Sequence, residues 1–343
     1  MIRVRPDERI FPVMRPATIV FAFAADGMAT SDLLQNTQLS ASDLTSPEIK
    51  VSLNQIITCC RNAASLCRDP FAAYRAGNRF HVSSYGIYGF AILCSPDLRQ
   101  TMRFSEQYHV LSAPLTEISY GEDGQHAGWT INPIPHPKID AQLYRFLVEL
   151  QFGIHVSLNR DTMGPWFMPQ EFHVRYKPPH DASLYRERLG CEVRFLQPEN
   201  RIIWSIAWMN KSPEVGNAAT YAAAIKLCDK MIDELHLRTG VSGKVREALF
   251  PHLTKRISVE DVAERLHITT RTLRRKLCEE NTSFRGLADE LRMQVAIKYL
   301  RDTRMTVDEI ADLLGFSDTA GFRRAFRRWT YRRPLDFKNL CQT

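Results

Sequence analysis

Arginine side chains recur on two short segments near the C-terminus, and each group follows an apolar stretch and a turn. A guanidinium can bind the O6 and N7 atoms of guanine through two parallel hydrogen bonds, or it can clamp a phosphate. The chemistry that these residue types indicate is recognition of nucleic acid. The candidate contact residues are Thr270, Arg271, Arg274 and Arg275 in the first segment, and Thr319, Ala320, Arg323, Arg324, Arg327 and Arg328 in the second.

Different roles are expected within each group. We expect Arg271 and Arg274 to point toward bases. Arg275 is expected to have a structural role, because its counterpart Arg324 lies between two core aromatic residues in the sequence. In the second segment, the residues expected at the groove are Thr319, Ala320 and Arg323, and those expected to neutralise phosphates are Arg324, Arg327, Arg328, Arg332 and Arg333.

The elements that must position these arginines repeat along the chain. An apolar pattern that begins at Val262-Ala263 returns 48 positions later at Ile310-Ala311. Each copy predicts a short helix, a tight turn and a second helix, which is the helix-turn-helix pattern. An expected helix over 284–301 joins the copies. It would be about 27 Å long, close to one DNA turn of about 34 Å.

Capping residues mark the helices of both units. Ser258 with Asp261, and Thr306 with Glu309, have the spacing of a capping box. Gly315 is expected to make the second turn, where a positive φ is needed. The candidate caps of the two second helices are Thr269 or Thr270, and Asp318 or Ser317.

The excess positive charge of the chain lies entirely in this region. The 343 residues include 45 Lys and Arg against 38 Asp and Glu, a formal net charge of +7. Residues 241–343 contain 21 basic and 14 acidic residues, so residues 1–240 are balanced at 24 of each. A basic domain beside a neutral one is typical of a nucleic-acid-binding module.

A second interpretation of the repeated units is a protein-binding module. Three-helix units with this apolar spacing also bind proteins, and a charged helix face is often only solvated. The duplication, the joining helix and the localised charge together favour DNA binding.

Residues 1–216 mix helical and strand patterns and predict an α+β domain, whereas residues 244–343 predict an all-α domain with two helix-turn-helix units joined by a linker helix. The order of strands in the sheet does not follow from the sequence. Helix starts are expected at Ser31, Ser42, Ser46-Pro47 and Ser95-Pro96-Asp97, with helical spacing over 53–64 and 139–158. Strand patterns cover 115–120, 129–131, 172–176, 191–195 and 201–208.

Residues 217–243 are expected to connect the two domains. A helix over 217–238 has apolar residues at the spacing of two heptads, which suits pairing with a copy of itself in a homodimer. The alternative is a helix packed on its own domain. Residues 239–243 contain two glycines and are expected to form the linker. The candidate dimer seam is Tyr221, Ile225, Cys228, Ile232 and Leu235.

Several classes of function lack their sequence signals. The eight cysteines include no Cys-x-x-Cys pair, so we expect reduced thiols, no metal site and no cofactor. The motifs of zinc proteases, serine hydrolases and phosphate-binding loops are missing, so no catalytic residue is expected. Without an apolar run of ~20 residues or a signal peptide, the protein is expected in the cytoplasm, away from membranes.

The C-terminal residues closely resemble the AraC/XylS family of bacterial transcription regulators. The resemblance covers about 244–340 and implies binding to double-stranded promoter DNA, usually as a dimer and mostly with activation. Two positions depart from the family, which often has Gly at Asn281 and usually has Gly at Tyr331. The matching stretches are 270–277, Ile310-Ala311-Asp312-Leu313-Leu314-Gly315-Phe316-Ser317-Asp318, Phe322-Arg323-Arg324-Ala325-Phe326-Arg327-Arg328-Trp329 and Pro334.

The N-terminal residues are similar to the effector domain of the branch that includes ornithine-utilisation regulators. Gly86-x-x-Gly89-Phe90-Ala91 and Ser95-Pro96-Asp97-Leu98 carry this resemblance. It implies ligand sensing and dimerisation by a domain that is not the sugar-binding barrel of the founding member.

Together these observations predict a sequence-specific, DNA-binding transcription regulator. It is expected to be an activator that works with RNA polymerase and is controlled by a small, apolar effector. The alternatives are an enzyme-like domain fused to a DNA-binding domain and a ligand-independent repressor or architectural protein. Aromatic residues are candidates for the effector pocket, although such residues also build cores. They are Tyr85, Tyr88, Phe90, Trp129 and Trp204.

Overall fold

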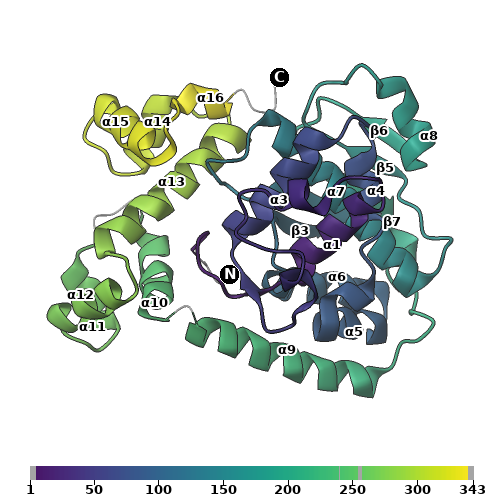
Figure 1. Ribbon diagram of the computed structural model, residues 1–343, viewed down its shortest axis with the longest axis horizontal. Coiled ribbons are helices and arrows are strands. Elements are labelled where there is room, and N and C mark those ends of the chain that lie inside the picture. Colours follow the sequence, from purple (N-terminus) through teal and green to yellow (C-terminus); the bar gives the residue numbers. More distant parts are fainter. Residues whose placement is uncertain (1–4, 239, 254–256, 339–343) are drawn as a thin grey trace.

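The computed structural model describes residues 5–238, 240–253 and 257–338. Figure 1 shows a large mixed domain, a long helix along its lower edge, and a smaller helical domain beside it. Thr239 of the expected linker and Cys341 lie outside the described residues. In the described part of the chain, no helix has the length and apolar character needed to cross a membrane.

A five-stranded sheet forms the centre of the N-terminal domain. The strand order is β3-β4-β7-β5-β6, and only the β5–β6 pair is parallel. The sheet is open, with β3 and β6 at its edges, so it is not a closed barrel. Its strands are β3 (Thr116–Glu122), β4 (His126–Pro133), β5 (Glu171–His173), β6 (Glu192–Arg194) and β7 (Arg201–Ser205).

Helices surround this sheet. The helical patterns at 53–64 and 139–158 are confirmed, and each of the strand patterns 115–120, 129–131, 172–176, 191–195 and 201–208 contains a strand. The strand expected to reach Trp208 ends at Ser205, because the next three residues form a 3-10 turn. The structure adds a small ribbon of β1 (Phe11–Pro12) and β2 (Lys50–Val51). The helices are α1 (Met14–Ala24), α2 (Thr30–Leu33), α3 (Leu53–Leu66), α4 (Ala72–Gly77), α5 (Gly86–Cys94), α6 (Leu98–Gln107), α7 (Ala141–Met163), α8 (Tyr185–Leu189) and α9 (Ala218–Arg238), with 3-10 turns η1 (Asp43–Thr45), η2 (Val82–Tyr85), η3 (His109–Ser112), η4 (Ala182–Leu184) and η5 (Ile206–Trp208).

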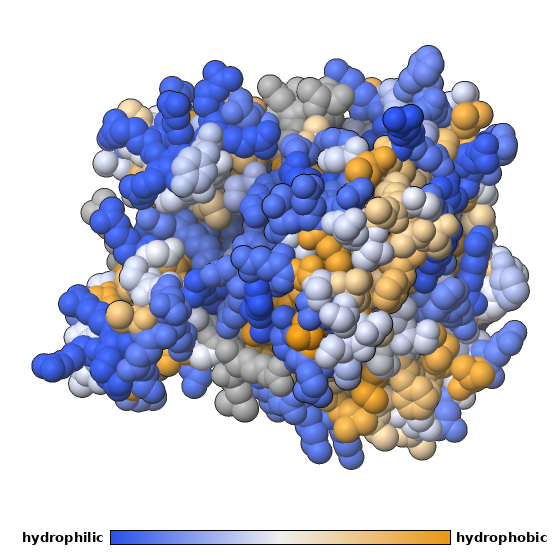
Figure 2. Space-filling model, in the orientation of Figure 1, coloured by the Kyte–Doolittle hydropathy of each residue, from blue (hydrophilic) through white to orange (hydrophobic). Residues whose placement is uncertain are grey.

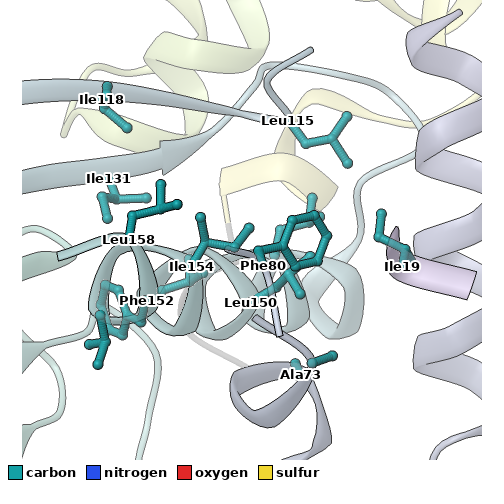
Figure 3. Packing of buried hydrophobic residues seen from close by; sticks show 14 of the residues in the cluster. Ile19, Ala73, Phe80, Leu115, Ile118, Ile131, Leu150, Phe152, Ile154 and Leu158 are labelled. Atoms are coloured by element: carbon teal, nitrogen blue, oxygen red, sulfur yellow. The ribbon is translucent and has the colours of Figure 1, made fainter. Parts of the chain in front are cut away.

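Helix α7 forms the centre of the hydrophobic core. In Figure 3, Ile118 of β3 and Ile131 of β4 lie over Ile154 and Leu158 of α7. On another face, α7 meets α4 backbone to backbone: a Cβ added at Gly77 would lie 2.2 Å from a carbonyl oxygen of α7. Glycine is required there because any side chain would separate the two helices.

Two expected helix starts were wrong. Ser46-Pro47 begins no helix, because the following residues pair as β2 with β1, at Pro12 opposite Lys50. Ser42 precedes only the 3-10 turn η1. Long-range strand pairing decided this segment, and a local capping pattern could not reveal it.

The stripe expected as a dimer seam packs on its own domain. Tyr221, Cys228 and Leu235 of α9 are buried in the N-terminal core, and the remaining seam residues Ile225 and Ile232 pack against it. The ring of Tyr221 lies 5.8 Å from that of Phe104. The seam prediction is therefore corrected in favour of its alternative, because this face of α9 is covered by α5 and α6.

The expected glycine linker is largely helical. Helix α10 begins at Gly240 and runs to Leu249, with Ser242 and Gly243 buried. Glu280 accepts hydrogen bonds from the backbone N–H groups of Val241 and Ser242, at 2.7 and 2.9 Å. These bonds satisfy donors that a helix start otherwise leaves free, which explains why the segment does not remain a loop.

The C-terminal domain has two small cores that share one helix. The first core joins α10, α11, α12 and the first half of α13, and the second joins the rest of α13 with α14, α15 and α16. The helices after α10 are α11 (Val259–Arg265), α12 (Thr270–Glu279), α13 (Phe284–Asp302), α14 (Val307–Leu313), α15 (Thr319–Thr330) and α16 (Pro334–Lys338), with η6 (Phe250–His252) after α10.

Candidate nucleic-acid interface

The first helix-turn-helix unit consists of α11, a turn and α12. Ser258 and Asp261 form the expected capping box at the start of α11. Thr269 caps α12, since its hydroxyl accepts a hydrogen bond from the Thr272 N–H at 3.1 Å. Leu273 and Leu277 are buried, so the opposite face of α12 is left for solvent or a ligand.

The second unit repeats this arrangement with α14 and α15. Thr306 and Glu309 form its capping box, and Asp318 caps α15 by accepting from the Gly321 N–H at 2.5 Å. Phe322 and Phe326 are fully buried. The apolar face of α15 is therefore fixed in the core in the same way as that of α12.

The turns of the two units have the same backbone hydrogen bonds. The N–H of Ile268 donates to the carbonyl of Ala263 at 3.0 Å, and Phe316 donates to Ala311 at 3.0 Å. The residue before each donor is left-handed, with φ of 54° at His267 and the expected positive value, 73°, at Gly315. The sequence repeat therefore corresponds to a structural repeat.

The arginines of both second helices project away from the protein. All seven candidate arginines on α12 and α15 are exposed, as is Ala320, whereas Thr270 and Thr319 are half-buried. The structural role expected for Arg275 was wrong: its side chain is 63% exposed and pairs with Glu279. Arg324 is exposed as well. Arg328 pairs with Asp289 of α13 at 3.0 Å.

Helix α13 separates the two units. Its 19 residues span about 28 Å at 1.5 Å per residue. Figure 1 shows α12 and α15 near its two ends, both at the left edge of the view and away from the N-terminal domain. Figure 2 shows hydrophilic residues over most of both units, whereas hydrophobic residues gather on the N-terminal domain.

A buried charge holds α10 against α13. Arg246 is fully buried, and its guanidinium lies 3.6 Å from the carboxylate of Glu290. Burial lowers the pKa of Arg246 and raises that of Glu290, and each group opposes the shift of the other. Sequence patterns gave no indication of this pair, because the two residues are far apart in the chain.

The aromatic residues proposed for an effector pocket do not form one. Tyr88, Trp129 and Trp204 are core residues, at most 4% exposed, while Phe90 is 47% exposed and Tyr85 is half-buried. A cavity does lie between the two domains, and none of these five residues lines it. Aromatic content therefore marked mainly the core and not the lining of this cavity.

Two helix-turn-helix units with exposed arginines, joined by one helix and attached to an α+β domain, define a DNA-binding protein with two reading helices. Residues 27–212 match the family described as the arabinose-binding domain of AraC transcription regulator, N-terminal, and residues 262–339 match a helix-turn-helix domain. The chain belongs to the AraC family of transcription regulators. It is therefore a DNA-binding transcription regulator and not an enzyme.

Known regulators are similar over nearly the whole chain. The ornithine utilization regulator of Pseudomonas aeruginosa is 26% identical over 330 residues, which is 96% of both chains. An HTH-type transcriptional regulator of Mycobacterium tuberculosis is 27% identical over 337 residues, 97% of both chains. The crystal structure of the regulator CdpR from P. aeruginosa covers 95% of this chain and 98% of its own, with 19% identity and a TM-score of 0.49.

Proposed function

We propose that this regulator is a transcription activator that binds promoter DNA as a homodimer and responds to a small molecule at its N-terminal domain. The observation that carries the proposal is the pair of exposed arginine faces, on α12 and α15, near the two ends of α13. Both faces can meet one side of a duplex if they enter successive major grooves about 34 Å apart.

The contact roles follow from position on the helices. Residues in the first turns of a reading helix reach base edges, while later residues reach the backbone. We assign Arg271 and Arg274 to contacts with base edges. Because the side chain of Arg275 is exposed, we assign it to a phosphate contact. The other proposed base-edge residues are Thr270, Thr319, Ala320 and Arg323, and the other proposed phosphate contacts are Arg324, Arg327 and Arg328.

The domain assignment follows the two cores. We assign residues 1–216 with α9 to sensing and residues 240–343 to DNA binding, and the boundary moves from 244 to 240 because α10 belongs to the first helix-turn-helix core. Ligand control requires that the effector bind one arrangement of the domains better than another. The name of the ornithine utilization regulator, the P. aeruginosa relative that is 26% identical, supports a metabolite as the effector.

Activation is supported by the names of shorter matches. The urease operon transcriptional activator of Escherichia coli is 37% identical over 84 residues, and the E. coli activator PerA is 22% identical over 140 residues. An activator of this kind would place RNA polymerase at the promoter. A ligand-independent repressor or architectural protein is the alternative outcome of the following experiment.

The test is footprinting of the full chain on its own upstream region, together with a reporter driven by that region. In the footprint, each protomer should protect two patches of DNA about one helical turn apart, and the second protomer should protect a second such pair of patches. In the reporter assay, the protein should increase transcription. Protection of one patch per protomer would contradict the use of both reading helices. Reduced transcription would make the protein a repressor.

A further inference from the structure

A cavity of about 650 Å³ lies where the N-terminal domain meets the DNA-binding domain. Its volume is in the range of small-molecule sites, about 300–1,000 Å³. Most of the wall comes from α6, η3, β3, the segment that follows β4, and α9. Glu247 of α10 and Gln294 of α13 complete it from the DNA-binding side. A molecule in this cavity would contact both domains at once.

The charged groups in the cavity wall have one sign. Its acidic side chains are Glu106, Glu117, Asp229 and Glu247, and the described residues that line it include no lysine or arginine. Burial lowers the pKa of His109 and that of His136, which also line it, to about 4 in each case. Both imidazoles are therefore neutral near pH 7 and do not offset the acidic groups.

Much of the rest of the wall is apolar, and its uncharged polar residues are Gln107, Tyr108, Thr116 and Gln294. Phe11, Leu53 and Ile232 contribute apolar surface, as do Val110 and Ile134. Thr116 also lines the cavity; it is 2% exposed, and its hydroxyl has no hydrogen-bond partner among the described residues.

We propose that this cavity is the effector site and that its ligand is an organic amine with an aliphatic or aromatic body. The acidic groups would attract and orient the ammonium, and the apolar wall would cover the body of the ligand. The acidic groups would repel a carboxylate. They also make an uncharged apolar effector, which the aromatic residues had suggested, a poor fit for this cavity. The inference rests on the proposed control by a small molecule and names its class and place.

The position of Glu117 links the ligand to the arrangement of the domains. Its carboxylate accepts a hydrogen bond from the ammonium of Lys298 of α13 at 2.5 Å, across the domain boundary. An amine bound beside Glu117 competes with Lys298 for this carboxylate. Its binding therefore weakens the contact between α13 and β3, and the loss of that contact favours the ligand by the same factor.

The experiment measures binding of defined amines to the full-length protein by calorimetry at fixed ionic strength. The probes are putrescine, cadaverine and phenethylamine, and octanoate is the carboxylate control. The test variants are Glu106→Gln and Asp229→Asn, whose amides can still accept the present hydrogen bonds from the Tyr120 N–H and the Tyr108 hydroxyl. Glu187→Gln, an exposed residue of α8, is the matched control for charge.

At least one probe amine should bind with a stoichiometry of one per chain. Each cavity variant should weaken binding by about tenfold, as expected for loss of a charged hydrogen-bond partner, and Glu187→Gln should leave it unchanged. Binding of octanoate in preference to every amine, no amine binding at all, or equal affinity in the cavity variants would each overturn the proposal. Circular dichroism of the variants confirms that they fold.

The same preparations separate this inference from the proposed function. Footprints that agree with the proposed function, combined with no amine binding, would reject the amine site and leave the regulator intact. Amine binding without any DNA footprint would reject the regulatory role of the cavity together with the proposed function.

Discussion

Arg175 and Asp302 form an ion pair across the domain boundary, with 2.7 Å between Nη1 and Oδ1. Arg175 follows β5 of the N-terminal sheet, and Asp302 ends α13. Their side chains are only 14% and 17% exposed. Asp302 also accepts a hydrogen bond from the guanidinium of Arg301. That guanidinium lies 5.4 Å from the ring centre of Tyr144. These contacts hold the end of α13, and with it the second helix-turn-helix unit, against the sheet.

Replacement of Asp302 by alanine should destabilise the protein. It removes the negative charge shared by two mostly buried guanidiniums, and breaking a buried pair in this way costs roughly 3 kcal/mol. Urea denaturation should show this loss. Glu279→Ala, which breaks the exposed pair with Arg275, should leave the midpoint unchanged. Similar midpoints for the two variants would show that the Asp302 pair adds nothing to stability.

The same pair should make stability depend on acid pH. Burial alone raises the pKa of Asp302, but the Arg301 and Arg175 guanidiniums hold it below its usual value of 3.8. Because the folded-state pKa is the lower one, the contribution is complete above about pH 4 and is lost as the pH falls through the folded pKa. The difference in urea midpoint between wild type and Asp302→Asn should therefore shrink below pH 4. A constant difference would contradict this.

Replacement of Tyr331 by glycine should stabilise the second unit. Tyr331 ends α15 in the left-handed conformation, with φ of 59°, and its side chain is 90% exposed. Glycine removes the backbone strain and sacrifices little packing, so a gain of about 0.5–1 kcal/mol is expected after the entropy cost of glycine. Thermal denaturation of Tyr331→Gly measures it.

Asn281→Gly is the matched control for that substitution. Asn281 has a similar φ of 53°, but asparagine tolerates the left-handed region better than tyrosine. Its stabilisation should therefore be smaller. Equal gains at both positions would show that the left-handed backbone strains asparagine as much as tyrosine, and would contradict a specific strain at Tyr331.

Local signals in the sequence were sufficient for the helix-turn-helix units. The caps at Ser258, Thr306 and Asp318 depend on residues three positions away, so the sequence contains both partners of each interaction. The positive φ at Gly315 also follows from one residue type. The assignment of individual arginines to bases or phosphates stays a prediction, because it depends on the DNA.

Contacts between distant segments could not be predicted in the same way. Helix α10 replaced a predicted linker because Glu280, some 40 residues later, bonds to its first N–H groups. The sheet order depends on pairings such as that of Phe172 with Ile202. The cavity is assembled from segments that range from Pro6 to Gln294. No periodicity in the sequence reports which of these segments meet.

Replacement of Arg271 by alanine should weaken specific DNA binding by roughly 1–3 kcal/mol if it reads a base. Its side chain is exposed, so the melting temperature should not change. Fluorescence anisotropy on the footprinted duplex and on a random duplex measures the effect. Equal losses on both duplexes would reassign Arg271 to a phosphate. Arg186→Ala on α8, which is 82% exposed, controls for net charge.

Residues 240–343 should fold alone and bind DNA. Their two cores contain side chains from α10 to α16, and Ala141 is the one N-terminal hydrophobic residue, among the described residues, that packs against them. The fragment begins at Gly240, because a start at residue 244 would remove Val241, which packs against the first core. It would also remove the two backbone N–H groups that donate hydrogen bonds to Glu280.

Circular dichroism and gel shifts at low salt test this fragment. It should be helical and should bind the footprinted duplex more weakly than the full chain, because it lacks the domain proposed to pair two copies. A second fragment, 244–343, should be less stable, since α10 loses its start. The complementary fragment 1–238 should fold around α7 and bind no DNA. Contacts between the exposed arginines and phosphates are strongest at low salt. A folded 240–343 fragment that binds no DNA at low salt would therefore refute the assignment of DNA binding to these residues.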